Sequence, residues 1–195
     1  PVSSVARSLI KFDQSQINDV IQNVASITSS LEFTASLKMY IAKADNVVLE
    51  SEVYVYPISG SWNNGSGQYL DNKVNTTGVS WVFSDYSGST KWPIQGFFSD
   101  NCTGSYSGSN NEGGCTWWTG SGGFIGIGSL EKGQIFNLRS EKDLDINVTD
   151  IVKVWYSSSN ALTGSLLPIA NEGFIAKWED STEFVTSSAV TPQLS

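Results

Sequence analysis

Hydrophobic and polar residues alternate along much of the chain with the period of two that is typical of half-buried β-strands. The clearest alternation covers residues 31–42 and is predicted to bury every second side chain: Leu31, Phe33, Ala35, Leu37, Met39 and Ile41. A turn at residues 44–46 leads to residues 47–56, so the pattern predicts an antiparallel hairpin. Pro57 has no backbone N–H for a strand ladder and is predicted to end the second strand.

Shorter runs of the same kind predict further strands, at residues 8–13, 78–83, 116–118, 133–138, 143–148 and 173–178. Residues 17–24 fit either a helical turn or an irregular connection. Many short strands separated by turn residues favour an all-β fold, an antiparallel β-sandwich or jelly roll. No linker divides the chain, which predicts one domain over residues 1–195.

The period changes once, after residue 148. Asn147 or Thr149 can cap a helix, and Asp150 places negative charge near its positive end. Residues 157–160, Ser-Ser-Ser-Asn, favour turns, so one short α-helix is predicted at residues 149–156. Its apolar face, which would plug one end of the sandwich, consists of Ile151, Val154 and Trp155.

Long loops rich in Gly, Ser, Asn and aromatic residues fill most of residues 84–128. A flat aromatic ring in such a loop can stack on a sugar while nearby amides bind its hydroxyls. The candidates for contact with a glycan or a protein partner are Trp62, Tyr106, Trp117 and Trp118. Large aromatic side chains also anchor loops to a sandwich, because burying them is favourable without any ligand.

Charge and hydropathy exclude some partners. The formal net charge is −8 and the 11 Lys and Arg residues are scattered, which argues against a nucleic-acid-binding surface. No apolar run approaches the roughly 20 residues that span a bilayer, so no membrane insertion is expected.

Catalytic and metal-binding patterns are weak. The chain has no histidine, which removes histidine-dependent triads and zinc motifs, and no spacing selects a glycosidase pair among its carboxylates. Residues 143–147 imitate the start of a calcium loop, but Val148 and Val154 replace the required Gly and Glu. The sequence predicts a non-enzymatic protein without a metal or cofactor.

Cys102 and Cys115 flank a loop of small polar residues. A disulfide between them would stabilise the fold by roughly 3 kcal/mol, whereas a reducing cytoplasm would keep both as thiols. Both states stay open at this point.

The succession of segments at residues 7–17, 30–42, 51–67 and 78–81, followed by DINVTDIVKVW and GFIAKWE, resembles the DNRLRE type of jelly-roll domain. This carbohydrate-binding-module-like sandwich occurs in bacterial surface proteins and phage virion proteins. The segments YPISGSWNNGSGQYLDN and TTGVSW are most similar to the versions of this domain that occur as structural proteins in tailed-phage particles.

The resemblance implies a structural component of a tailed-phage virion, such as a head decoration, fibre or tail-associated subunit. Such a protein would assemble in the host cytoplasm, contact other virion proteins and copies of itself, and bind host-surface polysaccharide. The alternative is a carbohydrate-binding module of a secreted or cell-surface protein, and a polysaccharide-cleaving enzyme is a third hypothesis.

Two departures from the family pattern concern assembly. The family usually has an earlier first strand and a further last strand, and neither is evident in this sequence. If both strands are missing, a neighbouring subunit can cover the open sheet edges by adding a strand. The simpler explanation is that such strands exist outside the residues seen. The loop at residues 157–170 is longer than usual, and its candidate assembly contacts are Ser157, Asn160, Leu162 and Leu166.

Overall fold

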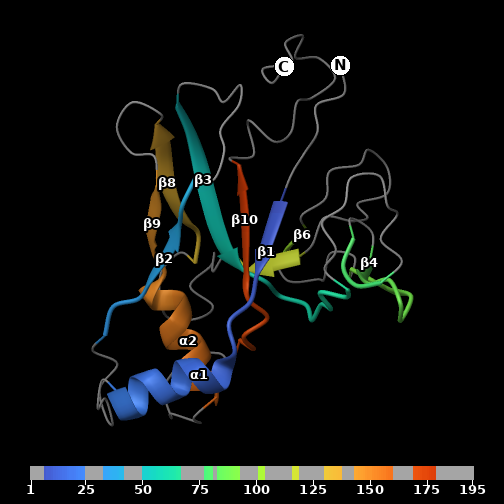
Figure 1. Cartoon of the computed structure of the whole chain (residues 1–195), viewed down its shortest axis with the longest axis horizontal. Helices are drawn as coiled ribbons and strands as arrows, with labels where there is room; N and C mark the ends of the chain where they lie inside the picture. Colours follow the sequence, from blue (N-terminus) through green and yellow to red (C-terminus); the bar gives the residue numbers. More distant parts are fainter. Residues whose placement is uncertain are drawn as a thin grey trace.

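A computed structural model of the chain describes residues 7–24, 33–41, 50–66, 77–80, 83–92, 101–103, 116–118, 130–137, 143–159 and 169–178. These residues form mostly antiparallel strands with two short α-helices, which confirms the predicted all-β sandwich. Figure 1 shows the larger strands side by side and the two helices packed together below them.

The main sheet has the strand order β1-β10-β3-β8, and every pair in it is antiparallel. The strands are β1 (Arg7–Ile10), β10 (Phe174–Trp178), β3 (Glu50–Pro57) and β8 (Lys132–Asn137). Strand β3 ends at Pro57, as predicted. Val55 pairs with Ala176 and Tyr56 with Ile175, so alternate pairs point to opposite faces of the sheet.

The second sheet pairs β2 (Ser36–Met39) with β9 (Leu144–Asn147). The predicted hairpin between residues 31–42 and 47–56 is therefore wrong, because β2 pairs with β9 while β3 pairs with β10 and β8. The alternation itself is confirmed from residue 33 to residue 39, where Leu37 is buried and Lys38 exposed. Alternation fixes which side of a strand is buried, but it carries no information about the partner strand.

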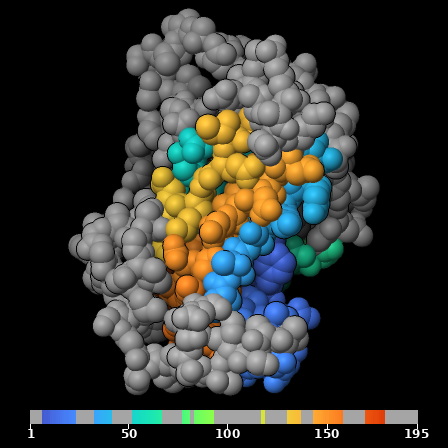
Figure 2. Space-filling view, turned by 90° about the vertical axis from the view of Figure 1, so that its left-hand side faces the viewer, coloured from blue at the N-terminus to red at the C-terminus, as the bar shows by residue number. Residues whose placement is uncertain are grey.

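One side chain joins the two sheets. The Nε2 atom of Gln134 on β8 donates to the carbonyl oxygen of Asp143 at 3.3 Å, and its Oε1 accepts from the backbone N–H of Asp145 at 2.7 Å. The amide thus bridges β8 and β9, where no backbone ladder is formed. Figure 2 shows β8 in yellow, β9 in orange and β2 in blue lying side by side on one face of the molecule.

Helix α2 (Thr149–Ser159) follows β9 directly. The side-chain oxygen of Asn147 accepts from the backbone N–H of Thr149 at 3.0 Å, which confirms the predicted cap. The predicted end at residue 156 is wrong, since the helix continues through Ser159. Ser157 is buried, and this tertiary packing outweighs the turn preference of the serine run.

A second helix precedes the second sheet. Helix α1 (Gln14–Asp19) continues into a π-helical turn (Val20–Val24), so the helical alternative for residues 17–24 is correct and the helix begins earlier than expected. Asp13 caps it by accepting from the backbone N–H of Ser15 at 2.7 Å.

The main core lies between the two sheets and α2. Leu37 and Ile146 come from the second sheet, Val55 and Phe174 from the main sheet, and Trp155 from α2. The rings of Trp155 and Phe174 lie 4.7 Å apart, and the predicted apolar face of α2 is almost completely buried: Ile151, Val154 and Trp155.

A smaller cluster covers the opposite face of the main sheet, through Tyr56, Ile58, Trp92, Trp117 and Ile175. Two short strand pairs extend this side: β4 (Phe83–Asp85) with β5 (Thr90–Lys91), and β6 (Asn101–Thr103) with β7 (Thr116–Trp118). The strand predicted at residues 78–83 is wrong, because residues 78–80 lie outside any strand. Gly78 has a φ of 81° and its Cα sits against Asn64 and Gly65, a close approach that only glycine permits.

Candidate functional site

Trp117 packs inside the smaller cluster and is only 4% exposed. Its ring lies 5.5 Å from the ring of Tyr56, and the guanidinium of Arg7 and the ammonium of Lys177 lie 5.3 and 5.5 Å from its centroid. These are cation–π distances. The predicted sugar-stacking role would require an open ring face, and the structure places Trp117 in a packed position instead.

Lys177 is a buried cation, with 2% of the residue exposed. Its ammonium donates to the carbonyl oxygen of Trp178 at 3.0 Å and lies 6.0 Å from the ring of Tyr56. The Tyr56 hydroxyl donates to a carboxylate oxygen of Glu131 at 2.9 Å. Aromatic faces and a carbonyl oxygen are among the groups that contact the ammonium, and such contacts lower the cost of burying a lysine in the sheet.

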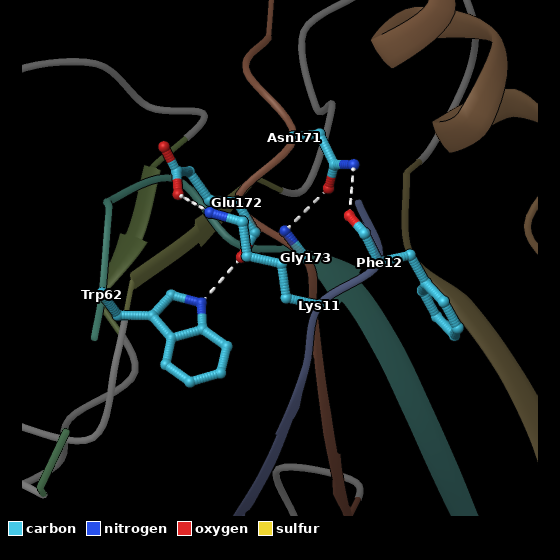
Figure 3. A network of polar contacts seen from close by, with 6 residues as sticks. All are labelled: Lys11, Phe12, Trp62, Asn171, Glu172 and Gly173. Carbon is cyan, nitrogen blue, oxygen red and sulfur yellow. Dashed lines mark hydrogen bonds and ion pairs between the residues drawn. The ribbon is translucent and has the colours of Figure 1, made fainter. Parts of the chain in front are cut away.

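Trp62 is half-buried, and a hydrogen bond holds its indole N–H. Its Nε1 donates to the carbonyl oxygen of Glu172 at 2.7 Å, and the Glu172 carboxylate accepts from Lys11 at 2.7 Å (Figure 3). The side chain of Asn171 joins the Phe12 carbonyl and the Gly173 N–H, at 3.1 and 3.0 Å (Figure 3). This network anchors the loop after β3 to the turn before β10.

The structure does not gather the aromatic candidates into one site. Trp118 follows Trp117 on β7 but packs against the main core rather than the smaller cluster. Cys102 lies in β6, and Ser157 lies in α2 at 6% exposure, so the prediction of an accessible loop at Ser157 is wrong. The remaining candidates fall outside the described residues: Tyr106, Cys115, Asn160, Leu162 and Leu166.

Among the described residues, the strongest candidate surface is a group of exposed side chains on β8, β9 and β2. We define the outer face by four exposed residues on β8, β9, β2 and the position after β2: Ile135, Asp145, Lys38 and Tyr40. Tyr40 is 74% exposed and Ile135 is 50% exposed. Lys38 and Asp145 form an exposed ion pair at 3.3 Å. None of the four residues is among the site residues predicted from the sequence, although Tyr40 places an aromatic ring at a position where the alternation calls for a polar residue.

The pKa values of two exposed carboxyls, Asp13 and Asp85, lie below their ordinary range, mainly because each accepts a hydrogen bond from a nearby serine hydroxyl, Ser15 or Ser87. No group of three or more His, Cys, Asp or Glu residues able to hold a metal occurs in the described part of the chain. Within the same residues, no helix is long and apolar enough to cross a membrane.

The described part of the chain is an antiparallel β-sandwich with a main core and a smaller aromatic cluster. Comparison of the chain with family models, curated proteins and solved structures found no match. The resemblance to the DNRLRE type therefore stays a prediction.

Proposed function

We propose that the chain is a non-enzymatic structural component of a tailed-phage virion, either a head decoration, a fibre or a tail-associated subunit. It assembles through contacts with other virion proteins and with copies of itself. The virion context rests on the series of sequence segments that resemble the DNRLRE type. The assembly function rests on the outer face, and above all on the 74% exposure of Tyr40.

The outer face has the chemistry of a protein–protein contact. Tyrosine is enriched at interfaces and at their energetic centres. Complete burial of an exposed isoleucine contributes roughly 1.5–3 kcal/mol, so covering the exposed half of Ile135 contributes about half of that amount. The Lys38–Asp145 pair is about half exposed on both sides, so it contributes at most about 1 kcal/mol and can exchange partners on binding.

The edge of β2 that pairs with none of the described strands adds specificity to this surface. Among the described strands, β2 pairs only with β9, and its outer edge is four residues long with Lys38 in it. A short edge strand with a lysine resists nonspecific strand pairing. A partner must therefore pair with the charge of Lys38 and pack against the ring of Tyr40 at the same time. This double requirement favours one defined contact over general aggregation.

Purified virus particles test the proposal directly. Mass spectrometry is expected to find the chain in several copies per particle, at a constant ratio to the other proteins. Tyr40→Ala is expected to reduce incorporation, whereas Tyr86→Ala, at an exposed aromatic residue on the β4–β5 turn, is not. A native chain found only as a free monomer, or equal incorporation of both variants, contradicts the proposal.

A second candidate is a carbohydrate-binding module of a secreted or cell-surface protein, favoured by Trp62, which is only half-buried and precedes the exposed Asn63. A glycan array followed by titration tests it, with Trp62→Ala expected to abolish binding and Tyr86→Ala expected to retain it. Circular dichroism of both variants separates loss of binding from loss of fold. Absence of binding to every glycan argues against this function.

A further inference from the structure

Asn64 is the one asparagine in the sequence that a glycine follows. An asparagine side chain can react without an enzyme, because the backbone nitrogen of the next residue can attack the side-chain amide carbon and expel ammonia. A following glycine speeds this step, since no Cβ hinders the approach of its nitrogen. Asn64 and Gly65 are both exposed, so water reaches the pair. The sequence supplies a reactive pair, and the fold decides how fast it reacts.

In the structure, a hydrogen bond holds the attacking nitrogen. The backbone N–H of Gly65 donates to Oδ1 of Asn63 at 2.9 Å. The Nδ2 atom of Asn63 donates in turn to a carboxylate oxygen of Asp85 at 3.4 Å, which helps to orient the amide. The Gly65 nitrogen must lose its proton to react, and a hydrogen bond to Asn63 keeps the N–H turned away from the side chain of Asn64. This contact therefore slows the reaction while the loop is closed.

The backbone around the pair is also clamped to a second segment. The N–H of Val79 donates to the carbonyl oxygen of Asn63 at 2.6 Å, and Gly78 packs directly against Asn64. A Cβ atom on residue 78 would lie 2.6 Å from the carbonyl oxygen of Asn64, so the contact leaves no room for an additional atom. Ring closure requires the Asn64 backbone to rotate. The reaction therefore needs local opening of this loop.

We propose that Asn64 is a site of spontaneous covalent modification, at which the chain converts slowly to isoaspartate and aspartate. The Gly65 nitrogen forms a bond to Cγ of Asn64, the bond from Cγ to the side-chain nitrogen breaks, and ammonia leaves with the proton of the Gly65 N–H. Water then opens the succinimide ring. Cleavage at Cγ gives aspartate, and cleavage at the main-chain carbonyl gives isoaspartate, whose backbone is longer by a methylene group.

The modification changes the loop that carries Trp62 in one direction only. The longer backbone of isoaspartate cannot restore the hydrogen bond between Asn63 and Val79 without displacing Gly78, so the modified loop stays open. Trp62 lies two residues before Asn64, and opening is expected to loosen its hydrogen bond to the Glu172 carbonyl. This site does not depend on the proposed assembly function, because the loop and the outer face share no residue.

Peptide mapping by mass spectrometry tests the site in the whole chain, incubated at mildly alkaline pH. Product is expected to accumulate at Asn64 in the native chain, at a rate about tenfold or more below that of the chain unfolded in urea. Isoaspartate methyltransferase identifies the isoaspartate form. Equal rates in the two samples would show that the fold does not control the reaction and would overturn the proposal. Product in the unfolded chain but none in the native chain would overturn it as well.

Substitution of Asn63 tests the protecting hydrogen bond. Asn63→Ala removes the acceptor of the Gly65 N–H and is expected to raise the rate at Asn64 about twofold to tenfold, as the net loss of one hydrogen bond allows. Ser61→Ala, at an exposed position of the same loop, is the matched control and is expected to keep the native rate. Equal rates in the two variants contradict the protecting role. If Asn63→Ala does not fold, the comparison of native and unfolded chains still decides the proposal.

Amide hydrogen exchange tests the effect on the loop. The isoaspartate form can be separated from the native form by ion exchange, because the modification adds a negative charge. The N–H of Val79 is expected to exchange about tenfold faster in the isoaspartate form than in the native form, since its acceptor on Asn63 has moved away. The N–H of Ile175, in the centre of β10, is the internal reference and is expected to stay unchanged. Equal exchange at Val79 in both forms would contradict release of the loop.

Discussion

The hydroxyl of Thr149 links the second sheet to the first turn of α2. Its Oγ1 accepts from the backbone N–H of Ala35 at 2.9 Å and lies 3.4 Å from the Ala35 carbonyl oxygen, which also accepts from the N–H of Val148 at 2.9 Å. Thr149 is 8% exposed. We expect Thr149→Val to remove this link while preserving the shape of the side chain.

The expected loss of stability follows from the backbone N–H of Ala35, which loses its acceptor. Valine cannot accept, so the Ala35 N–H loses the partner that the structure gives it in a partly buried position. An unsatisfied donor in such a place costs about 1–3 kcal/mol. For a domain of this size, each kcal/mol lowers the melting temperature by about 2–4 °C, so a loss near 2 kcal/mol corresponds to about 4–8 °C.

Urea unfolding followed by tryptophan fluorescence measures the change. Thr34→Val is the control, because Thr34 is exposed next to Ala35 and is expected to change stability by less than about 0.5 kcal/mol. If Thr149→Val also stayed within 0.5 kcal/mol of the native chain, the proposed link between β2 and α2 would be refuted.

Three further predictions concern turns and their polar groups. Ser89 has a φ of 53°, so Ser89→Gly is expected to raise the free energy of unfolding in urea by about 0.5 kcal/mol, and a decrease contradicts this. Gly173 has a φ of 91°, and an added Cβ would collide with the carbonyl oxygen of Ile10, so Gly173→Ala is expected to destabilise by more than about 1 kcal/mol in the same assay. The Ser87 hydroxyl and the Gly88 N–H lower the pKa of Asp85, so stability from its ionised form is present above the unfolded pKa and is lost as pH falls through the folded pKa. Ser87→Ala is expected to raise that pKa in an NMR titration, and an unchanged value rules out the hydroxyl as its cause.

Local patterns predicted the strands better than they predicted strand partners. Residues 133–138, 143–148 and 173–178 match β8, β9 and β10 to within about a residue at each end, because period-two alternation is a local property. The partner of β2 lies more than 100 residues away, as the Ser36–Asn147 pair shows. Short turns favour hairpins on average, and that preference gave the wrong partner here.

Burial of the aromatic candidates depends on contacts that no local pattern contains. Trp117 bridges to Ile58 and packs on Tyr56, while its neighbour Trp118 faces the main core. The sequence predicted a short strand at residues 116–118 among long loops, and β7 confirms it, but the cluster that each tryptophan contacts depends on how distant parts of the chain pack. Conversely, the period-two alternation already predicts that Tyr40 lies on the exposed side of its strand. The structure adds that Tyr40 belongs to a larger exposed surface, the outer face.

Covalent footprinting of Tyr40 tests the assembly account most directly. Tyrosine nitration, read by mass spectrometry, would be compared between the isolated chain and intact virus particles, with Tyr86 as the internal reference. The account predicts strong labelling of Tyr40 in the isolated chain and protection in the particle, with a larger change than at Tyr86. Equal labelling of Tyr40 in both samples would contradict the outer face as an assembly surface, and absence of the chain from particles would contradict the virion context.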